Sequence, residues 1–244
     1  MLAAPTLATA LLSVLQMASG SGAPGRVVAA PHGGYDQNTE YMARNIAGRL
    51  GYGWVRALAY RSVPLRYWYD VNRPTERPYR RGRFGDPVWT AEAQRVYDEY
   101  QQRLEGAARR SGPLDLLVEI HGHSRTVPAG GRSLRVQVIE LATTGFTRTE
   151  LRALKRHYEE LQRSLPASQR VPLAIDRLDP HFEYRGWWIP FHFRASEAKR
   201  KGSLRPTKAR RALHFELPPR VRDSAAVRSA YERLLARLIR RAAG

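Results

Sequence analysis

Short apolar runs alternate with amphipathic segments along most of the chain. The apolar runs predict buried strands at 26–30, 54–60, 65–71, 114–120, 134–142, 171–175 and 212–217. Between these runs, apolar residues recur every three or four positions, which predicts helices at 39–50, 90–110, 147–164 and from 223 towards the C-terminus. Strands that alternate with helices are typical of α/β proteins. We therefore expect a single α/β domain over 26–244, folded as a three-layer sandwich around a mixed, largely parallel sheet.

The expected helices carry recognisable start signals. Asn38 or Thr39 can cap the first helix, because short polar side chains accept hydrogen bonds from the first free N–H groups. Thr147 and Glu150 have the T-x-x-E spacing of a capping box. Asp223 is the expected cap of the last helix.

The first 22 residues, MLAAPTLATALLSVLQMASGSG, are mostly apolar and small. Their length and the MASG near their end are typical of a secretory signal peptide, although no Lys or Arg precedes Arg26. A mobile N-terminal arm and a start codon placed too early are the alternatives. A signal peptide would place the protein in the periplasm or outside the cell, and without one it would stay in the cytoplasm. No later segment approaches the roughly 18–20 apolar residues of a membrane span.

Two expected strands end in a histidine. His32 follows the run at 26–30, and His121 follows the run at 114–120. Asp36 lies four residues after His32, across a Gly-Gly turn. The carboxyl ends of strands in an α/β sheet meet at one edge, where ligands bind. Two imidazoles and one carboxylate form the three-residue ligand set of a catalytic zinc site, and the chain has no cysteine to offer a thiolate instead.

A hydrolytic zinc site also needs a general base that does not bind the metal. Glu216 is the candidate, because it lies late in the apolar run at 212–217, where an unpaired carboxylate would be costly. The alternative role for Glu216 is a salt bridge with one of the many arginines. His123 and His214 share strand faces with His121 and Glu216, so both are candidates for orienting these residues. For His123, the alternatives are a substitute metal ligand and a loop histidine without a role in the site.

Four stretches occur in the order typical of one enzyme family: VVAAPHGGYDQNTEYMARNIAGRLG, VNRP, EIHGHS and ALHFELPPRVR. With these motifs, residues 26–222 resemble the N-formylglutamate amidohydrolase family, which is related to zinc carboxypeptidases and to phage poly-γ-glutamate hydrolases. The resemblance implies a phosphorylase/hydrolase-like sandwich that binds one zinc ion per chain. The family's glycine-rich KGGH stretch is replaced here by YRGWWIPFHFR at 184–194, so the resemblance supports the chemistry more strongly than the formylglutamate substrate.

The resemblance also implies roles for individual residues. His32, Asp36 and His121 match the zinc ligands, and Glu216 matches the catalytic glutamate of the late strand. Arg73, in VNRP, matches an arginine that is implied to bind a carboxylate of the substrate.

Basic residues greatly outnumber acidic ones. The chain has 41 Lys and Arg residues and 22 Asp and Glu residues, a formal net charge of +19, which attracts polyanions and acidic substrates. We expect a zinc hydrolase that cleaves an amide bond in an acidic small molecule, peptide or polymer. Arg73, Arg61 or Arg185 would hold a carboxylate or the oxyanion. We expect no specific nucleic-acid binding. The alternative is a non-catalytic protein that binds polyanions on a hydrolase scaffold.

Overall fold

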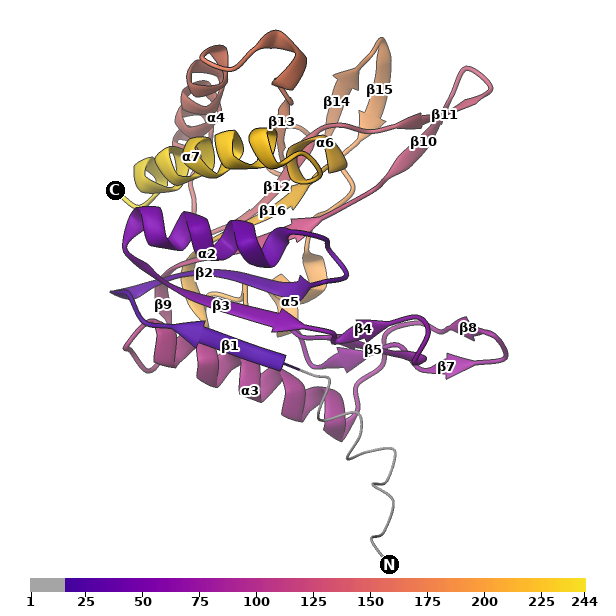
Figure 1. Cartoon of the computed structure of the whole chain (residues 1–244), viewed down its shortest axis with the longest axis vertical. Helices are drawn as coiled ribbons and strands as arrows, with labels where there is room; N and C mark the ends of the chain where they lie inside the picture. Colours follow the sequence, from indigo (N-terminus) through magenta and orange to yellow (C-terminus); the bar gives the residue numbers. More distant parts are fainter. Residues whose placement is uncertain (1–15) are drawn as a thin grey trace, which may run out of the picture.

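The computed structural model describes residues 16–244, and a seven-stranded mixed sheet runs through it (Figure 1). The strand order is β1 (Gln16–Gly20), β3 (Tyr52–Leu58), β2 (Ala23–Gly33), β9 (Leu114–Gly122), β16 (Ala209–Leu217), β12 (Ile139–Thr144) and β13 (Leu173–Ile175). The strands β3, β2, β9 and β16 are parallel to one another. β1 and β12 run antiparallel to β3 and β16, and β13 is parallel to β12.

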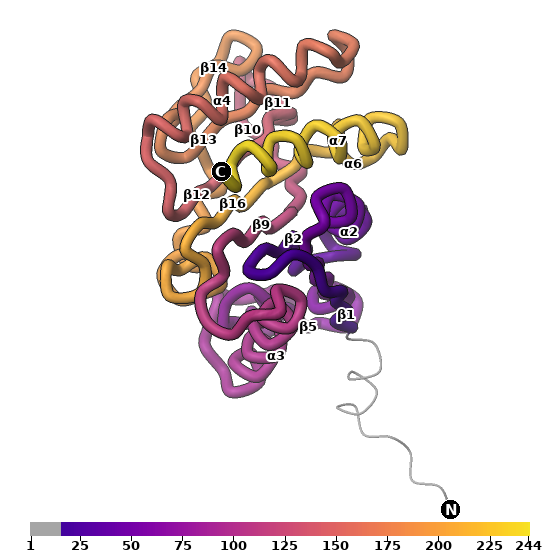
Figure 2. Tube along the Cα trace, turned by 90° about the vertical axis from the view of Figure 1, so that its left-hand side faces the viewer, coloured from indigo at the N-terminus to yellow at the C-terminus, as the bar shows by residue number. Residues whose placement is uncertain are grey.

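Helices cover both faces of the sheet, as Figures 1 and 2 show. On one face, α7 (Ala225–Ala242) packs between α2 (Thr39–Leu50) and α4 (Arg148–Arg163). The opposite face is covered by α3 (Ala91–Ala107). Along β2, Val28 and Ala30 enter the larger core under α2 and α7, whereas Val27 and Ala29 enter the core with α3. The strand is apolar throughout because both of its faces are buried, and the expected three-layer sandwich is confirmed.

Short elements extend from the carboxyl ends of the parallel strands. The additional strands are β4 (Arg61–Ser62), β5 (Tyr67–Asp70), β6 (Thr75–Glu76), β7 (Tyr79–Arg80), β8 (Arg83–Phe84), β10 (Thr126–Ala129), β11 (Arg132–Arg135), β14 (His181–Tyr184) and β15 (Trp187–Pro190). Three short helices complete the described chain: η1 (Ala167–Gln169), α5 (Ser196–Lys201) and α6 (Pro219–Arg222). The strand expected at 65–71 therefore belongs to the small sheet β4–β5–β6 rather than to the central sheet.

The strand expected at 134–142 is interrupted in the structure. Its first part is β11, which forms a hairpin with β10 across Gly130 and Gly131, both at positive φ. Its second part is β12 of the central sheet. Val136 and Val138 lie between the two strands and are buried in a separate small cluster. Buried and more exposed residues thus keep alternating between β11 and β12, so the sequence pattern does not reveal that the strand is interrupted there.

The helix starts agree with the sequence except at α7. Thr147 and Glu150 form the predicted capping box of α4. Asn38 occupies the N-cap position of α2, but its side chain does not cap the helix: Nδ2 donates to the Arg222 carbonyl at 3.2 Å instead. The prediction for Asp223 was wrong, because Ser224 is the N-cap residue of α7. Asp223 is instead the C-cap residue of α6, since Pro219 starts that short helix early.

The N-terminal segment expected at 1–22 overlaps an element of the sheet. Residues 1–15 lie outside the described part of the chain, but β1 pairs antiparallel with β3 from Gln16↔Leu58 to Gly20↔Trp54. Met17 also packs against the core under α3. The sheet therefore begins before residue 26, the expected start of the domain. Whether the N-terminus is cleaved in the cell stays a prediction.

Among residues 16–244, no helix combines the length and the apolar character needed to cross a membrane.

Truncation tests the contribution of β1. A chain that starts at residue 23 loses the pairing of β1 with β3 and leaves β3 as the edge strand. We expect its melting temperature to lie at least about 5 °C below that of a chain starting at residue 16, since about 1 kcal/mol shifts the midpoint by 2–4 °C at this size. Differential scanning calorimetry of both chains measures this, and equal midpoints would show that β1 contributes nothing.

Candidate metal centre

Two neighbouring parallel strands bring the three expected ligands together. His32 lies near the end of β2 and His121 near the end of β9. Asp36 follows β2 in a tight turn, in which Gly34 has a positive φ of 81° and the Asp36 N–H donates to the His32 carbonyl at 2.9 Å. The Thr39 hydroxyl donates to the Asp36 carbonyl at 2.7 Å and links this turn to the start of α2.

The donor atoms of these residues form a small triangle. Nδ1 of His32 lies 3.0 Å from Nδ1 of His121, and Oδ2 of Asp36 lies 3.5 Å from each of them. Zinc–ligand bonds of about 2.0–2.1 Å in a tetrahedral site separate the donor atoms by about 3.3 Å. Two imidazole nitrogens and one carboxylate oxygen at these separations therefore fit a single zinc ion, with a fourth position left for water or substrate.

The three residues change one another's pKa because they are buried side by side. Burial lowers the pKa of His32 to about 3, with Arg61 adding to the effect. His121 is also buried, but hydrogen bonds to Asp36 and Glu119 raise its pKa to about 9. The two histidines hold the pKa of Asp36 well below its usual range, against the effect of burial. Near pH 7 the metal-free triangle thus carries an ionised Asp36, a neutral His32 and a protonated His121.

Glu119, which the sequence analysis missed, holds two of the site's histidines. Its side chain is completely buried in β9. Oε2 lies 3.3 Å from Nε2 of His121 and 3.2 Å from Nδ1 of His214. Its two histidine contacts hold the pKa of Glu119 well below its usual range in spite of burial. A carboxylate behind a metal-binding histidine fixes the ring and increases the basicity of the nitrogen that faces the metal.

Glu119, His121 and His214 are themselves close enough to hold a metal ion. However, the other contacts of Glu119 occupy its oxygen atoms. Asn72 donates to Oε2 at 2.9 Å, and the hydroxyls of Tyr100 and Ser203 donate to Oε1 at 3.1 and 2.7 Å. This carboxylate is therefore better suited to orienting the histidines than to binding a metal.

Glu216 lies on β16, the strand next to β9, in register with His121. Its Oε1 atom is 3.3 Å from Nε2 of His214, and among the described residues no arginine forms a salt bridge with it. The alternative role in an arginine pair thus has no support in the structure. Glu119, His214 and Glu216 form a continuous chain, in which one imidazole contacts both carboxylates.

Arg61 and Arg73 converge on the buried Asp70. Their NH2 atoms lie 2.7 and 2.9 Å from the carboxylate of Asp70. Burial raises the pKa of Asp70, but the two arginines outweigh burial and lower it to about 2. Arg61 also lies 2.8 Å from Nε2 of His32 and stacks on Trp68 at 4.9 Å. Asp70 therefore fixes two cationic groups beside the candidate ligands.

These residues line a cleft of about 580 Å³. The lining includes the candidate ligands, Glu216, the aromatic residues Tyr35, Trp68 and Phe193, and the four arginines Arg61, Arg73, Arg77 and Arg194. On the rim, the N–H groups of His192 and Phe193 donate to Glu140 at 2.6 and 3.0 Å. Glu140 is fully buried and also binds Arg125 at 2.7 Å. It is a second acidic residue that the sequence analysis did not single out.

Two expected site residues make other contacts. Arg185 lies in the turn between β14 and β15 at positive φ, and it is not among the residues that line the cleft. The expectation that it binds substrate therefore stays a prediction. His123 does line the cleft, but its Nε2 atom contacts the Val138 carbonyl at 3.0 Å rather than a candidate ligand. Of the two supporting histidines, only His214 contacts Glu216.

Comparison with solved structures shows that similar α/β folds are known. No protein-family model and no curated protein matches the sequence. The zinc-free apo form of YndL superposes with a TM-score of 0.52 at 10% identity, covering 93% of this chain and 90% of that one. The gene product Atu2144 from Agrobacterium tumefaciens has a TM-score of 0.48 at 13% identity, covering 91% and 92% of the chains. A bacteriophage poly-gamma-glutamate hydrolase has a TM-score of 0.46 at 10% identity, covering 92% and 87%.

The raised pKa of His121 makes zinc affinity depend on pH. Zinc binding requires the free electron pair of Nδ1, so below about pH 9 the ion must displace a proton from His121. His32 is already neutral in this range. We expect affinity to increase about tenfold per pH unit between pH 6 and 8, with one proton released. Titrations in metal buffers, together with calorimetry in two buffers of different ionisation enthalpy, measure both quantities. An affinity that is constant over this range would show that zinc binding displaces no proton from His121.

Proposed function

We propose that the protein is a zinc-dependent hydrolase that cleaves an amide bond in an acidic substrate. The observation that carries this proposal is the donor triangle of His32, Asp36 and His121, set beside Glu216 in a cleft lined by arginines. The YndL-like fold and the four motifs that resemble N-formylglutamate amidohydrolases support it. Candidate substrates are N-acyl amino acids, γ-glutamyl chains and wall peptides. Export to an extracellular substrate remains part of the proposal.

His32, Asp36 and His121 would hold the zinc ion. When bound, zinc would polarise the scissile carbonyl group and make a water molecule more acidic. Glu216 is the general base in this proposal: it accepts a proton from the attacking water and returns it to the leaving nitrogen. His214 positions the Glu216 carboxylate, and Glu119 positions His214 in turn.

The arginines in the cleft favour an acidic substrate. A guanidinium group has five N–H donors, and the contacts of Arg61 and Arg73 with Asp70 use only some of them. The Nε atom of Arg61 is buried and has no hydrogen-bond partner among the described residues. The free donors suit a carboxylate of the substrate or the oxyanion that develops at the scissile carbonyl.

A non-catalytic polyanion-binding protein is the alternative. The net charge of +19 supports it. A pure binding protein, however, has no need for two buried histidines and an aspartate at zinc-like separations, nor for a glutamate held beside them. Binding that weakens steeply with salt, in a protein that takes up no zinc, would favour this alternative.

Replacement of Glu216 tests the proposed chemistry. Glu216→Gln keeps the size of the side chain and all three candidate ligands but removes the base. We expect unchanged zinc content and a loss of about 10² or more in turnover. The assay measures amine release from N-formyl-glutamate and chain shortening of poly-γ-glutamate. Glu183→Gln, an exposed change outside the cleft, is the matched control. Full turnover in Glu216→Gln would exclude Glu216 from the mechanism.

A further inference from the structure

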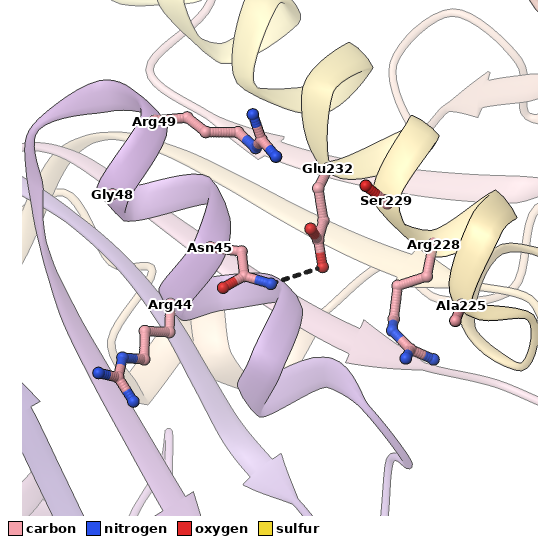
Figure 3. Close-up of a pocket in the computed structure, with 8 residues that line it drawn as sticks. All are labelled: Arg44, Asn45, Gly48, Arg49, Ala225, Arg228, Ser229 and Glu232. Carbon is pink, nitrogen blue, oxygen red and sulfur yellow. Dashed lines mark hydrogen bonds between the residues drawn. The ribbon is translucent and has the colours of Figure 1, made fainter.

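A second polar groove lies between α2 and α7, away from the cleft (Figure 3). Its volume is about 660 Å³. The side chains that line it are Arg44, Asn45 and Arg49 of α2 and Arg228, Ser229 and Glu232 of α7. We call it the α2–α7 groove. Both helices start at the edge of the sheet that carries the metal centre: α2 follows Asp36, and α7 follows Glu216 by way of α6.

The arginines of this groove are not neutralised by acidic partners. Among the described residues, none of the three forms a salt bridge. The guanidinium group of Arg44 lies 5.5 Å from the ring of Trp54, and Arg228 donates to the Arg222 carbonyl at 2.7 Å. Arg49 and Arg228 come from opposite helices, on either side of Glu232 (Figure 3). Their positive charges are available to anionic groups that enter the groove.

The middle of the groove offers hydrogen-bond acceptors. Glu232 is buried, and Oε1 accepts a hydrogen bond from Nδ2 of Asn45 at 3.0 Å. The other carboxylate oxygen of Glu232 and the amide oxygen of Asn45 have no hydrogen-bond partner in the described chain. The groove thus has arginine donors at its sides and the oxygen acceptors of Asn45 and Glu232 in its middle. A chain that carries both carboxylates and amide N–H groups matches this arrangement.

Gly48 is the one glycine among the residues that line the groove. It lies inside α2 and lines the groove, and a Cβ atom added there would meet nothing within 4 Å. Glycine disfavours a helix interior because of its backbone entropy. No neighbouring atom requires glycine at this position, so packing does not explain it. Its effect is to leave the groove open.

The lining argues against two other classes of partner. It contains no aromatic side chain on which a nucleobase could stack. It also contains no large apolar side chain that could enter a lipid layer. An acidic polyamide needs neither of these features.

We propose that the α2–α7 groove binds an acidic polyamide chain and holds it outside the catalytic cleft. The proposal rests on the proposed function, since it makes the substrate a polymer of linked acidic residues whose scissile bond is presented to the metal centre. Carboxylates of the chain pair with Arg44, Arg49 and Arg228, while its N–H groups donate to Glu232 and Asn45. Short acidic amides would reach the cleft without using the groove.

Two changes at Gly48 test the groove. Gly48→Glu adds a negative charge to it, whereas Gly48→Gln adds the same bulk without charge, and both residues favour the helix more than glycine does. We expect Gly48→Glu to weaken binding of fluorescein-labelled poly-γ-glutamate about tenfold more than Gly48→Gln, as one repulsive charge at short range predicts. Fluorescence anisotropy is read in the Glu216→Gln background, so that the polymer is not cut. Equal affinity of the two variants would overturn the proposal.

A charge-matched pair of triple variants separates the groove from net charge. The first replaces Arg44, Arg49 and Arg228 with Gln. The control replaces three exposed arginines of α4 with Gln: Arg148, Arg152 and Arg156. We expect the polymer's dissociation constant to increase at least about tenfold in the groove variant and less than threefold in the control. Equal losses of polymer affinity in the two variants would overturn the proposal. The proposal would also be overturned if the groove variant weakened binding of a labelled oligothymidylate as much as it weakens binding of the polymer.

The two proposals can fail separately. Binding is measured without turnover, so it stays readable if the protein neither takes up zinc nor hydrolyses any amide. In the Glu216-containing protein, we expect the groove variant to increase KM for poly-γ-glutamate and to leave turnover of N-formyl-glutamate unchanged. If the groove variant cleaved poly-γ-glutamate more slowly but still bound it with full affinity, the binding role of the groove would be refuted. The proposed metal centre would be unaffected by that result.

Discussion

A fully buried carboxylate in the central sheet, that of Glu119, determines how the candidate metal ligands and Glu216 are arranged. A charge in this position is tolerated only where hydrogen bonds replace water. Five side chains contact it: Asn72, Tyr100, His121, Ser203 and His214. The two histidines are thereby fixed in different directions. His121 directs Nδ1 towards Asp36 and His32, and His214 directs Nε2 towards Glu216.

Two further buried acids hold the walls of the cleft in a similar way. Asp70 fixes Arg61 and Arg73, and Glu140 fixes the rim at 192–193. The acidic groups that are buried thus neutralise part of the arginine charge and position the rest. The positive field that remains in the cleft suits a substrate with carboxylates. The α2–α7 groove has a similar arrangement, because its arginines lie beside the buried carboxylate of Glu232.

The sequence predicted the sandwich, and it predicted that four polar residues lie together at one edge of the sheet, because strand ends are visible in apolar runs and parallel strands end at one edge. The catalytic and metal-binding roles of these residues stay predictions. His32, Asp36, His121 and Glu216 all follow from that rule. Glu119 was missed inside LLVEI, although a charge within an apolar run was the signal already used for Glu216. The sequence did not reveal the β14–β15 turn that puts Arg185 outside the cleft lining. It also did not reveal the early start of α6, which makes Asp223 a C-cap residue. The α2–α7 groove exists only because two distant helices pack together, which no local pattern shows.

Metal content is the most direct test of the metal centre. Native mass spectrometry of the purified chain, after incubation with zinc and buffer exchange, would be compared with a His32→Ala/His121→Ala double variant. We predict about one zinc ion per chain in the first protein and none in the second, since two of the three ligands are lost. A folded wild-type chain that takes up no zinc, or a double variant that retains it, would contradict a metal site at His32, Asp36 and His121.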